Sequence, residues 1–158
     1  MISVQEKPGT TAAGNSQVVS ALNKQIANWN VLYVKLHNYH WFVKGQQFFT
    51  LHQKFEELYT EAATHIDELA ERVLSVGGHP LATMREYAAE ASVKEASGSE
   101  QAVEMAAAVV SDFKLMMDEL RTAMETAQKA GDEGTFDMLL GIRSSLEKHV
   151  WMLSSFTA

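Results

Sequence analysis

The stretch FTLHQKFEELYTEAATHIDELAERVLSV, residues 49–76, contains neither proline nor glycine and is typical of one long amphipathic helix. On a helical wheel of about 100° per residue, its apolar side chains gather on one face, which predicts that this face packs into a helical core. The members of this apolar face are Phe55, Leu58, Ala62, Ile66, Leu69, Val73 and Val76. The helix should end before Gly77, Gly78 and Pro80, because these residues interrupt helices.

A different face of the same helix carries four potential metal ligands, His52, Glu56, Asp67 and Glu71. All four lie within about 100° of one another on the wheel, well away from the apolar face. Glu56 and Asp67, however, are about 16 Å apart along the helix axis, whereas metal–ligand bonds are only about 2 Å long. The first pair and the second pair therefore cannot bind one ion within a single chain.

The spacing of the four residues is symmetric about residues 61 and 62. Two antiparallel copies of the helix that cross there would bring His52 and Glu56 of one chain close to Asp67 and Glu71 of the other, as a two-fold interface requires. We therefore predict two equivalent metal sites shared between subunits. The alternative is that the four residues simply form a solvated polar face.

The rest of the chain predicts three more long helices and no strand. We expect a helix over residues 17–43, a third over 99–130 and a last one that carries Phe136 to Leu153. The third has a regular apolar seam of Ala106, Val110, Phe113, Met117, Leu120, Met124 and Ala127.

Two further segments complete the predicted organisation. Residues 81–99 are too long for a tight turn and contain a short amphipathic piece around Thr83–Ala89, so they indicate a crossover. Residues 1–16 are small and polar and predict a flexible tail. The sequence therefore predicts an all-α fold: a ferritin-like four-helix bundle over residues 17–158, with a short helix in the long crossover between the second and third helices.

The composition restricts the function classes. The 158 residues are 46% hydrophobic and 21% charged, as expected for one globular domain. There is no cysteine, which excludes disulfides, zinc fingers and iron–sulfur clusters and fits a cytoplasmic location. We find no signal-peptide pattern and no apolar run long enough to span a membrane. The net charge of −7 favours cations over a phosphate backbone as partners.

The candidate ligands suit a particular chemistry. Carboxylates combined with imidazole bind divalent transition metals, and carboxylate-rich sites favour harder ions such as iron and manganese. The chain lacks the repeated Glu-x-x-His motif that builds di-iron sites inside helical bundles. We therefore expect an apolar bundle interior and a metal site that lies between chains.

Several motifs together resemble the Dps family of mini-ferritins. They are residues 38–45, NYHWFVKG, with His52 twelve residues after His40, then residues 67–72, DELAER, and residues 77–80, GGHP. The resemblance covers roughly residues 18–155. It implies a homo-oligomeric, dodecameric shell built from two-fold dimers around an iron-mineral cavity. It also implies ferroxidase centres at the two-fold interfaces, with hydrogen peroxide as the preferred oxidant.

The resemblance also assigns residues to the iron site. It places His40, His52 and Glu56 on one subunit, and Asp67 and Glu71 on its partner. Four of these are the residues that the helical wheel selects, and His40 is added by the resemblance alone.

Trp41 and the remaining histidines are candidates for structural rather than chemical roles. Trp41 is either an aromatic that a stray radical can oxidise or an interface side chain. His37 and His65 are expected to be structural and His79 to be solvated, and His149 has no acidic residue at a spacing that suggests a site.

Asp132, Glu133 and Asp137 begin the last helix, where negative charge is favourable. The resemblance suggests instead that Asp132 and Asp137 line acidic three-fold pores for ferrous iron.

Two functions from different classes follow. The first is oxidation and storage of iron, and the acidic balance supports it. The second is nonspecific DNA compaction, which depends on cationic tails. Here the N-terminal tail offers Lys7 against Glu6, and residues 154–158 carry no basic side chain, so we expect weak or no DNA binding. A third reading, a ferritin-fold scaffold without chemistry, would require the four ligand candidates to be incidental.

Overall fold

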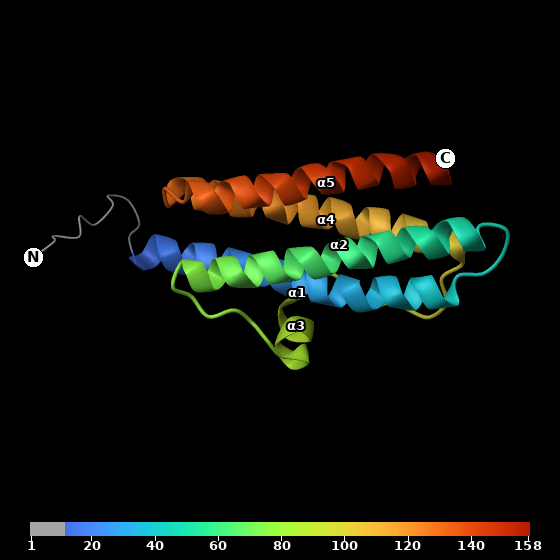
Figure 1. Ribbon diagram of the computed structural model, residues 1–158, viewed down its shortest axis with the longest axis horizontal. Coiled ribbons are helices and arrows are strands. Elements are labelled where there is room, and N and C mark those ends of the chain that lie inside the picture. Colours follow the sequence, from blue (N-terminus) through green and yellow to red (C-terminus); the bar gives the residue numbers. More distant parts are fainter. Residues whose placement is uncertain (1–11) are drawn as a thin grey trace, which may run out of the picture.

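The computed structural model describes residues 12–158. This part of the chain forms five helices and no strand: α1 (Ala12–Phe42), α2 (Phe48–Ser75), α3 (Met84–Glu90), α4 (Ala102–Lys129) and α5 (Glu133–Thr157). The four long helices form an antiparallel bundle in which α1 packs on α2 and α4 packs on α5 (Figure 1). The short helix α3 lies outside the bundle beside α1. The predicted four-helix bundle with a short helix in its crossover is therefore confirmed.

The helix ends agree with the sequence except at the N-terminus. Helix α1 begins at Ala12 rather than at Gln17, so residues 12–16 are helical and do not belong to the expected flexible tail. Residues 1–11 of that predicted tail lie outside the described part of the chain. Helix α3 begins after Thr83, whose hydroxyl accepts a hydrogen bond from the Glu86 amide at 3.3 Å while the Glu86 carboxylate accepts one from the Thr83 amide. This reciprocal cap explains why a seven-residue helix starts there.

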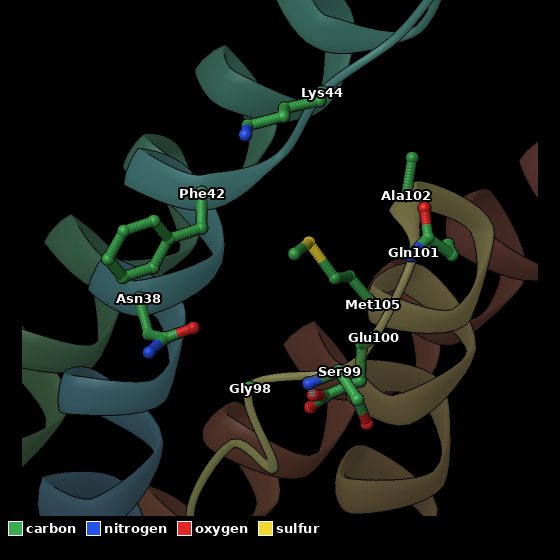
Figure 2. A pocket seen from close by; sticks show the side chains of 9 residues that line it. All are labelled: Asn38, Phe42, Lys44, Gly98, Ser99, Glu100, Gln101, Ala102 and Met105. Atoms are coloured by element: carbon green, nitrogen blue, oxygen red, sulfur yellow. Dashed lines mark hydrogen bonds between the residues drawn. The ribbon is translucent and has the colours of Figure 1, made fainter.

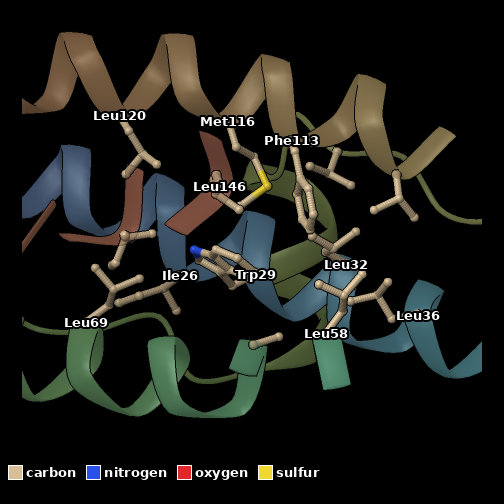
Figure 3. Close-up of a cluster of buried hydrophobic side chains, with 14 of the residues drawn as sticks. Ile26, Trp29, Leu32, Leu36, Leu58, Leu69, Phe113, Met116, Leu120 and Leu146 are labelled. Carbon is tan, nitrogen blue, oxygen red and sulfur yellow. The ribbon is translucent and has the colours of Figure 1, made fainter. Parts of the chain in front are cut away.

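The core contains large apolar side chains from all four long helices (Figure 3). Trp29 of α1 lies at its centre, with Leu58 of α2, Phe113 of α4 and Leu146 of α5 also buried. The predicted seam of α4 is partly wrong. Its deepest positions include Val109, Met116 and Ala123, whereas Val110, Met117 and Met124 are only half-buried. With 3.6 residues per turn, neighbouring positions of a helix can both face the other helices. At these three turns the sequence pattern selected the more exposed of the two neighbouring residues.

The bundle interior is not purely apolar, which corrects the expectation from the sequence. Lys35 of α1 is 7% exposed and forms an ion pair with Asp112 of α4 at 2.8 Å, and its ammonium also donates to the Lys94 carbonyl at 2.9 Å. Asn28 is fully buried and accepts the Ser92 amide at 2.8 Å. The bond to the Lys94 carbonyl and the bond from the Ser92 amide attach the crossover after α3 to the face of α1, because buried backbone groups need partners.

Candidate metal centre on helices α1 and α2

A tight turn between α1 and α2 places two histidines against each other. Gly45 in this turn has φ of 101°, a backbone conformation that glycine adopts without the steric cost of a Cβ atom. The chain thereby reverses within the residues between Phe42 and Phe48. As a result, His40 in the last turn of α1 faces His52 in the second turn of α2.

The two histidines hold each other by reciprocal hydrogen bonds. His40 Nδ1 lies 2.6 Å from the backbone carbonyl of His52, and His52 Nδ1 lies 2.7 Å from the backbone carbonyl of His40. A carbonyl oxygen only accepts hydrogen bonds, so both Nδ1 atoms are the donors and carry the protons. In the neutral rings, each Nε2 atom is therefore left with a free lone pair, the form in which imidazole binds metals.

The imidazole rings of the pair are stacked. Their centroids are 3.7 Å apart and their planes differ by 13°. His40 is 8% exposed and His52 is half-buried. Glu56 follows one turn after His52 and is exposed, with its carboxylate 3.4 Å from the hydroxyl of Tyr59. The structure therefore brings together His40, which only the family resemblance selected, and His52, while Glu56 follows one turn later on α2.

Asp67 and Glu71 lie on exposed positions farther along α2. The helix is continuous from Phe48 to Ser75, so its rise keeps Asp67 about 16 Å from Glu56 in the same chain. Within residues 12–158, no three His, Cys, Asp or Glu side chains are placed to hold a metal ion. One chain thus does not bring the five candidate ligands together in a single site.

Aromatic side chains surround the histidine pair. Phe48 stacks on His52 with ring centroids 4.9 Å apart, and Tyr59 meets His40 edge-on at 5.4 Å. His37 stacks on Tyr59 at 3.8 Å and donates from Nδ1 to the Tyr33 carbonyl, in agreement with the structural role expected for it. Trp41 is 66% exposed and touches His37, so its ring lies on the surface beside the centre.

Comparison with known proteins places this chain in a family. The profile of the ferritin-like domain family matches residues 19–158. Over 142 residues the chain is 58% identical to DNA protection during starvation protein 2 of Bacillus anthracis, which covers 90% of this chain and 97% of that protein. The crystal structure of a Dps protein from Bacillus brevis superposes with a TM-score of 0.93 at 56% identity, covering 94% of this chain and all of that one. The chain belongs to the Dps family.

More distant Dps structures share the whole fold. A Dps protein from Vibrio cholerae O1, described as a member of the ferritin-like diiron-carboxylate superfamily, is 33% identical with a TM-score of 0.91 over the full length of both chains. These matches confirm the family that the motifs indicated. In this Dps chain, none of the helices described between residues 12 and 158 is long and apolar enough to cross a membrane.

The sequence patterns did not reveal a partly buried polar cluster of the Dps chain. Glu61 of α2 receives hydrogen bonds from His149 Nε2 at 2.5 Å and from the Ser145 hydroxyl, both on α5, and His65 Nε2 lies 3.3 Å away. His149 has no acidic residue at a suggestive spacing on its own helix, and its acidic partner comes from α2. His65 is 8% exposed against Trp29, as a structural histidine should be. Glu61 and His65 are four residues apart, but only tertiary packing reveals their partner on α5.

The charges in this cluster change the acidity of Glu61. Burial raises the pKa of its carboxyl, but the contacts with His149, His65 and Ser145 outweigh that effect and hold the pKa well below its usual range. Glu61 therefore stays ionised and binds α5 to α2.

Asp132 is occupied at the start of α5. Its carboxylate accepts hydrogen bonds from the Thr135 amide at 3.0 Å and from Arg72 at 2.7 Å. Burial raises the pKa of Asp132, but the hydrogen bonds from Thr135 and Arg72 outweigh it and leave the pKa below its ordinary value. These contacts favour the helix-capping interpretation of Asp132 over a pore-lining one, whereas Asp137 is exposed.

A separate pocket of about 360 Å³ lies at the end of the bundle, between the C-terminal part of α1 and the start of α4 (Figure 2). Its acidic side chain is Glu100, whose carboxylate accepts the Tyr39 hydroxyl at 2.5 Å. Hydrogen bonds from Ser97 and Tyr39 lower the pKa of Glu100 to about 2. None of the five candidate ligands lines this pocket, so it is distinct from the centre on α1 and α2.

Proposed function

We propose that this Dps-family chain oxidises ferrous iron at sites shared between two subunits and stores the ferric product in a shell. Its subunits would form a dodecamer built from two-fold dimers, and hydrogen peroxide would be the oxidant. One observation carries the proposal: the stacked pair of His40 and His52 leaves both Nε2 atoms free, with Glu56 one turn after His52 on α2.

The second half of each site would come from a partner subunit. Asp67 and Glu71 share the exposed face of α2 with Glu56, but are too far along the helix to meet the histidines of their own chain. An antiparallel crossing of two α2 helices at a two-fold axis would bring them together. The resulting set of two imidazoles and three carboxylates suits iron.

The ring stacking supports two ferrous ions per site. A metal ion binds imidazole in the plane of the ring, at about 2.0–2.1 Å from the nitrogen. Planes that differ by 13° with centroids 3.7 Å apart do not meet within that reach. Each imidazole would therefore bind its own ion, as in sites that hold a pair of metal ions.

Two ions per site would allow peroxide to be reduced by two electrons in one reaction. Each ferrous ion gives one electron, and one peroxide molecule takes both, so its O–O bond breaks and two protons complete two water molecules. The hydroxyl radical, which forms when peroxide accepts a single electron, is then not released. The carboxylates of Glu56, Asp67 and Glu71 would compensate the positive charge that increases on oxidation.

An anaerobic ferrous titration tests this proposal. We expect saturation at two ferrous ions per interface site, followed by consumption of about one peroxide per two ions and a much slower reaction with oxygen. Binding of a single ion per site, or a peroxide requirement of one per ion, would contradict the paired-electron reaction.

A further inference from the structure

Three rings are stacked in series at the start of α2. Phe48 lies over His52 with centroids 4.9 Å apart and planes 24° apart, and His52 lies over His40 at 3.7 Å and 13°. Phe48 and His52 are four residues apart on one helix, so their side chains share a face. His52 is therefore held between a phenyl ring on one side and an imidazole on the other.

The orientation of His52 depends on few contacts. Its Nδ1 makes one hydrogen bond, to the His40 carbonyl at 2.7 Å, and the ring is only half-buried. The terminal torsion of a histidine side chain has broad energy wells, so one hydrogen bond leaves the ring free to tilt. A tilted ring exposed to water can move its proton to Nε2, and that tautomer has no lone pair there for a metal.

We propose that Phe48 is a positioning residue for the metal centre. Its ring covers the outer face of His52, keeps the imidazole parallel to His40, and thereby fixes both the tautomer and the spacing of the two Nε2 atoms. Phe48 does not contact the ion, and it acts only through His52. This inference rests on the proposed function, because it assigns to Phe48 a part in binding the ions of that site.

The local chain explains why the ring reaches this place. Helix α2 begins at Phe48, whose amide donates to the Gly45 carbonyl at 3.1 Å. The glycine turn therefore sets both the helix start and the position of Phe48 one turn before His52. The next residue, Phe49, is the same residue type but is 83% exposed, and its ring meets Phe48 edge-on at 5.3 Å rather than stacking on His52.

This pair of phenylalanines gives a matched experiment. We expect Phe48→Leu, which keeps an apolar side chain but removes the flat ring, to weaken Zn²⁺ binding by about ten- to hundredfold, the usual effect of removing a group that orients a metal ligand. Phe48→Tyr keeps a flat ring and should bind within about twofold of wild type. Phe49→Leu should not change binding.

Zinc affinity is measured by calorimetry on the assembled protein, with native mass as the control for assembly. Zinc is redox-inert, so this readout does not depend on oxidation. In the peroxide assay, Phe48→Leu should raise the ferrous KM more than it lowers kcat, since ions that do bind would still react. If Phe48→Leu does not assemble, Phe48→Met replaces it with the same expected loss.

Two results would overturn the inference. One is an assembled Phe48→Leu protein that binds Zn²⁺ as tightly as wild type. The other is a Phe48→Tyr protein as weak as Phe48→Leu, which would show that ring planarity has no role. Failure of the proposed function is distinguishable, because wild type itself would then bind no ion at this site or oxidise no iron.

Discussion

Arg72 of α2 reaches Asp132 at the first turn of α5, with 2.7 Å between the guanidinium Nη2 and the carboxylate Oδ1. The same carboxylate caps α5 by accepting the Thr135 amide. The Asp132 side chain is 8% exposed, so this contact is shielded from water. It connects the α1–α2 pair of helices to the α4–α5 pair.

Replacing Asp132 should therefore destabilise the protein. We expect Asp132→Ala to lower the free energy of unfolding by about 1–3 kcal/mol, because it removes a helix cap and leaves Arg72 without its partner. Asp137→Ala, at an exposed position of the same helix, should stay within about 0.5 kcal/mol of wild type. Denaturant unfolding at fixed protein concentration measures both.

The exposed position Asp137 also tests the pore alternative. If Asp137 lines an acidic pore, Asp137→Asn should slow iron oxidation at low salt while leaving the final extent unchanged, since a ring of negative charge raises the local cation concentration. Stopped-flow oxidation at low and high salt provides the measurement. Equal rates at low salt would remove Asp137 from the uptake path.

Shared sites predict complementation between two inactive chains. His52→Ala/Glu56→Ala and Asp67→Ala/Glu71→Ala should each oxidise iron poorly alone. A mixed dimer should recover one of its two sites, because one site would then contain only wild-type ligands. Co-assembled and mass-verified mixed dimers are tested with peroxide and ferrous iron. Ligands supplied by a single chain would leave the mixture inactive.

Glu61 predicts a defined response to acid. Its folded pKa is held below the usual range, so its contribution to stability is present above the unfolded pKa of about 4.3 and is lost only as the pH falls through the lower folded value. We expect Glu61→Gln to cost about 1–3 kcal/mol at pH 7 and at pH 5. The gap to wild type should narrow only in stronger acid.

The control for this prediction is Glu57→Gln. The Glu57 side chain is 55% exposed and its ion pair with Lys54 is on the surface, so the change should have little effect at any of these pH values. A Glu61→Gln protein as stable as Glu57→Gln would show that the cluster with His149 contributes nothing measurable.

Protection of DNA should not require binding to it. We expect the protein to prevent nicking of plasmid by ferrous iron and peroxide, and Asp67→Ala/Glu71→Ala to lose most of that protection while still assembling. The changed residues are exposed and lie away from the core. A gel shift at physiological salt serves as the control for binding. A shift by wild type would overturn our expectation of weak DNA binding.

The sequence predicted what a single helix can encode. The two faces of α2 follow from the 3.6-residue period: most of the predicted apolar side chains are buried, although Ile66 and Val76 are half-buried, and Glu56, Asp67 and Glu71 are exposed. The bundle could be predicted as well, because four long periodic segments and one long crossover leave few arrangements.

The hydrophobic pattern of the sequence could not predict which side chains meet between helices. His149 has no acidic residue at helical spacing on α5 that would suggest a site, yet it meets Glu61 because α2 and α5 pack together at that point. Asp132 could equally have been a cap or a pore residue until Arg72 was placed beside it. The reciprocal bonds of His40 and His52 likewise depend on the reversal of the chain at Gly45.

The separation of the ligands along α2 determines when a newly synthesised subunit would become active. With the proposed division of ligands, a newly synthesised chain holds only half of every site and cannot react with iron before it finds a partner. The rate of iron oxidation would then rise with the square of subunit concentration in very dilute solution, until dimers saturate. Dimer formation would thus act as the switch that turns the chemistry on, and an isolated subunit would not oxidise iron.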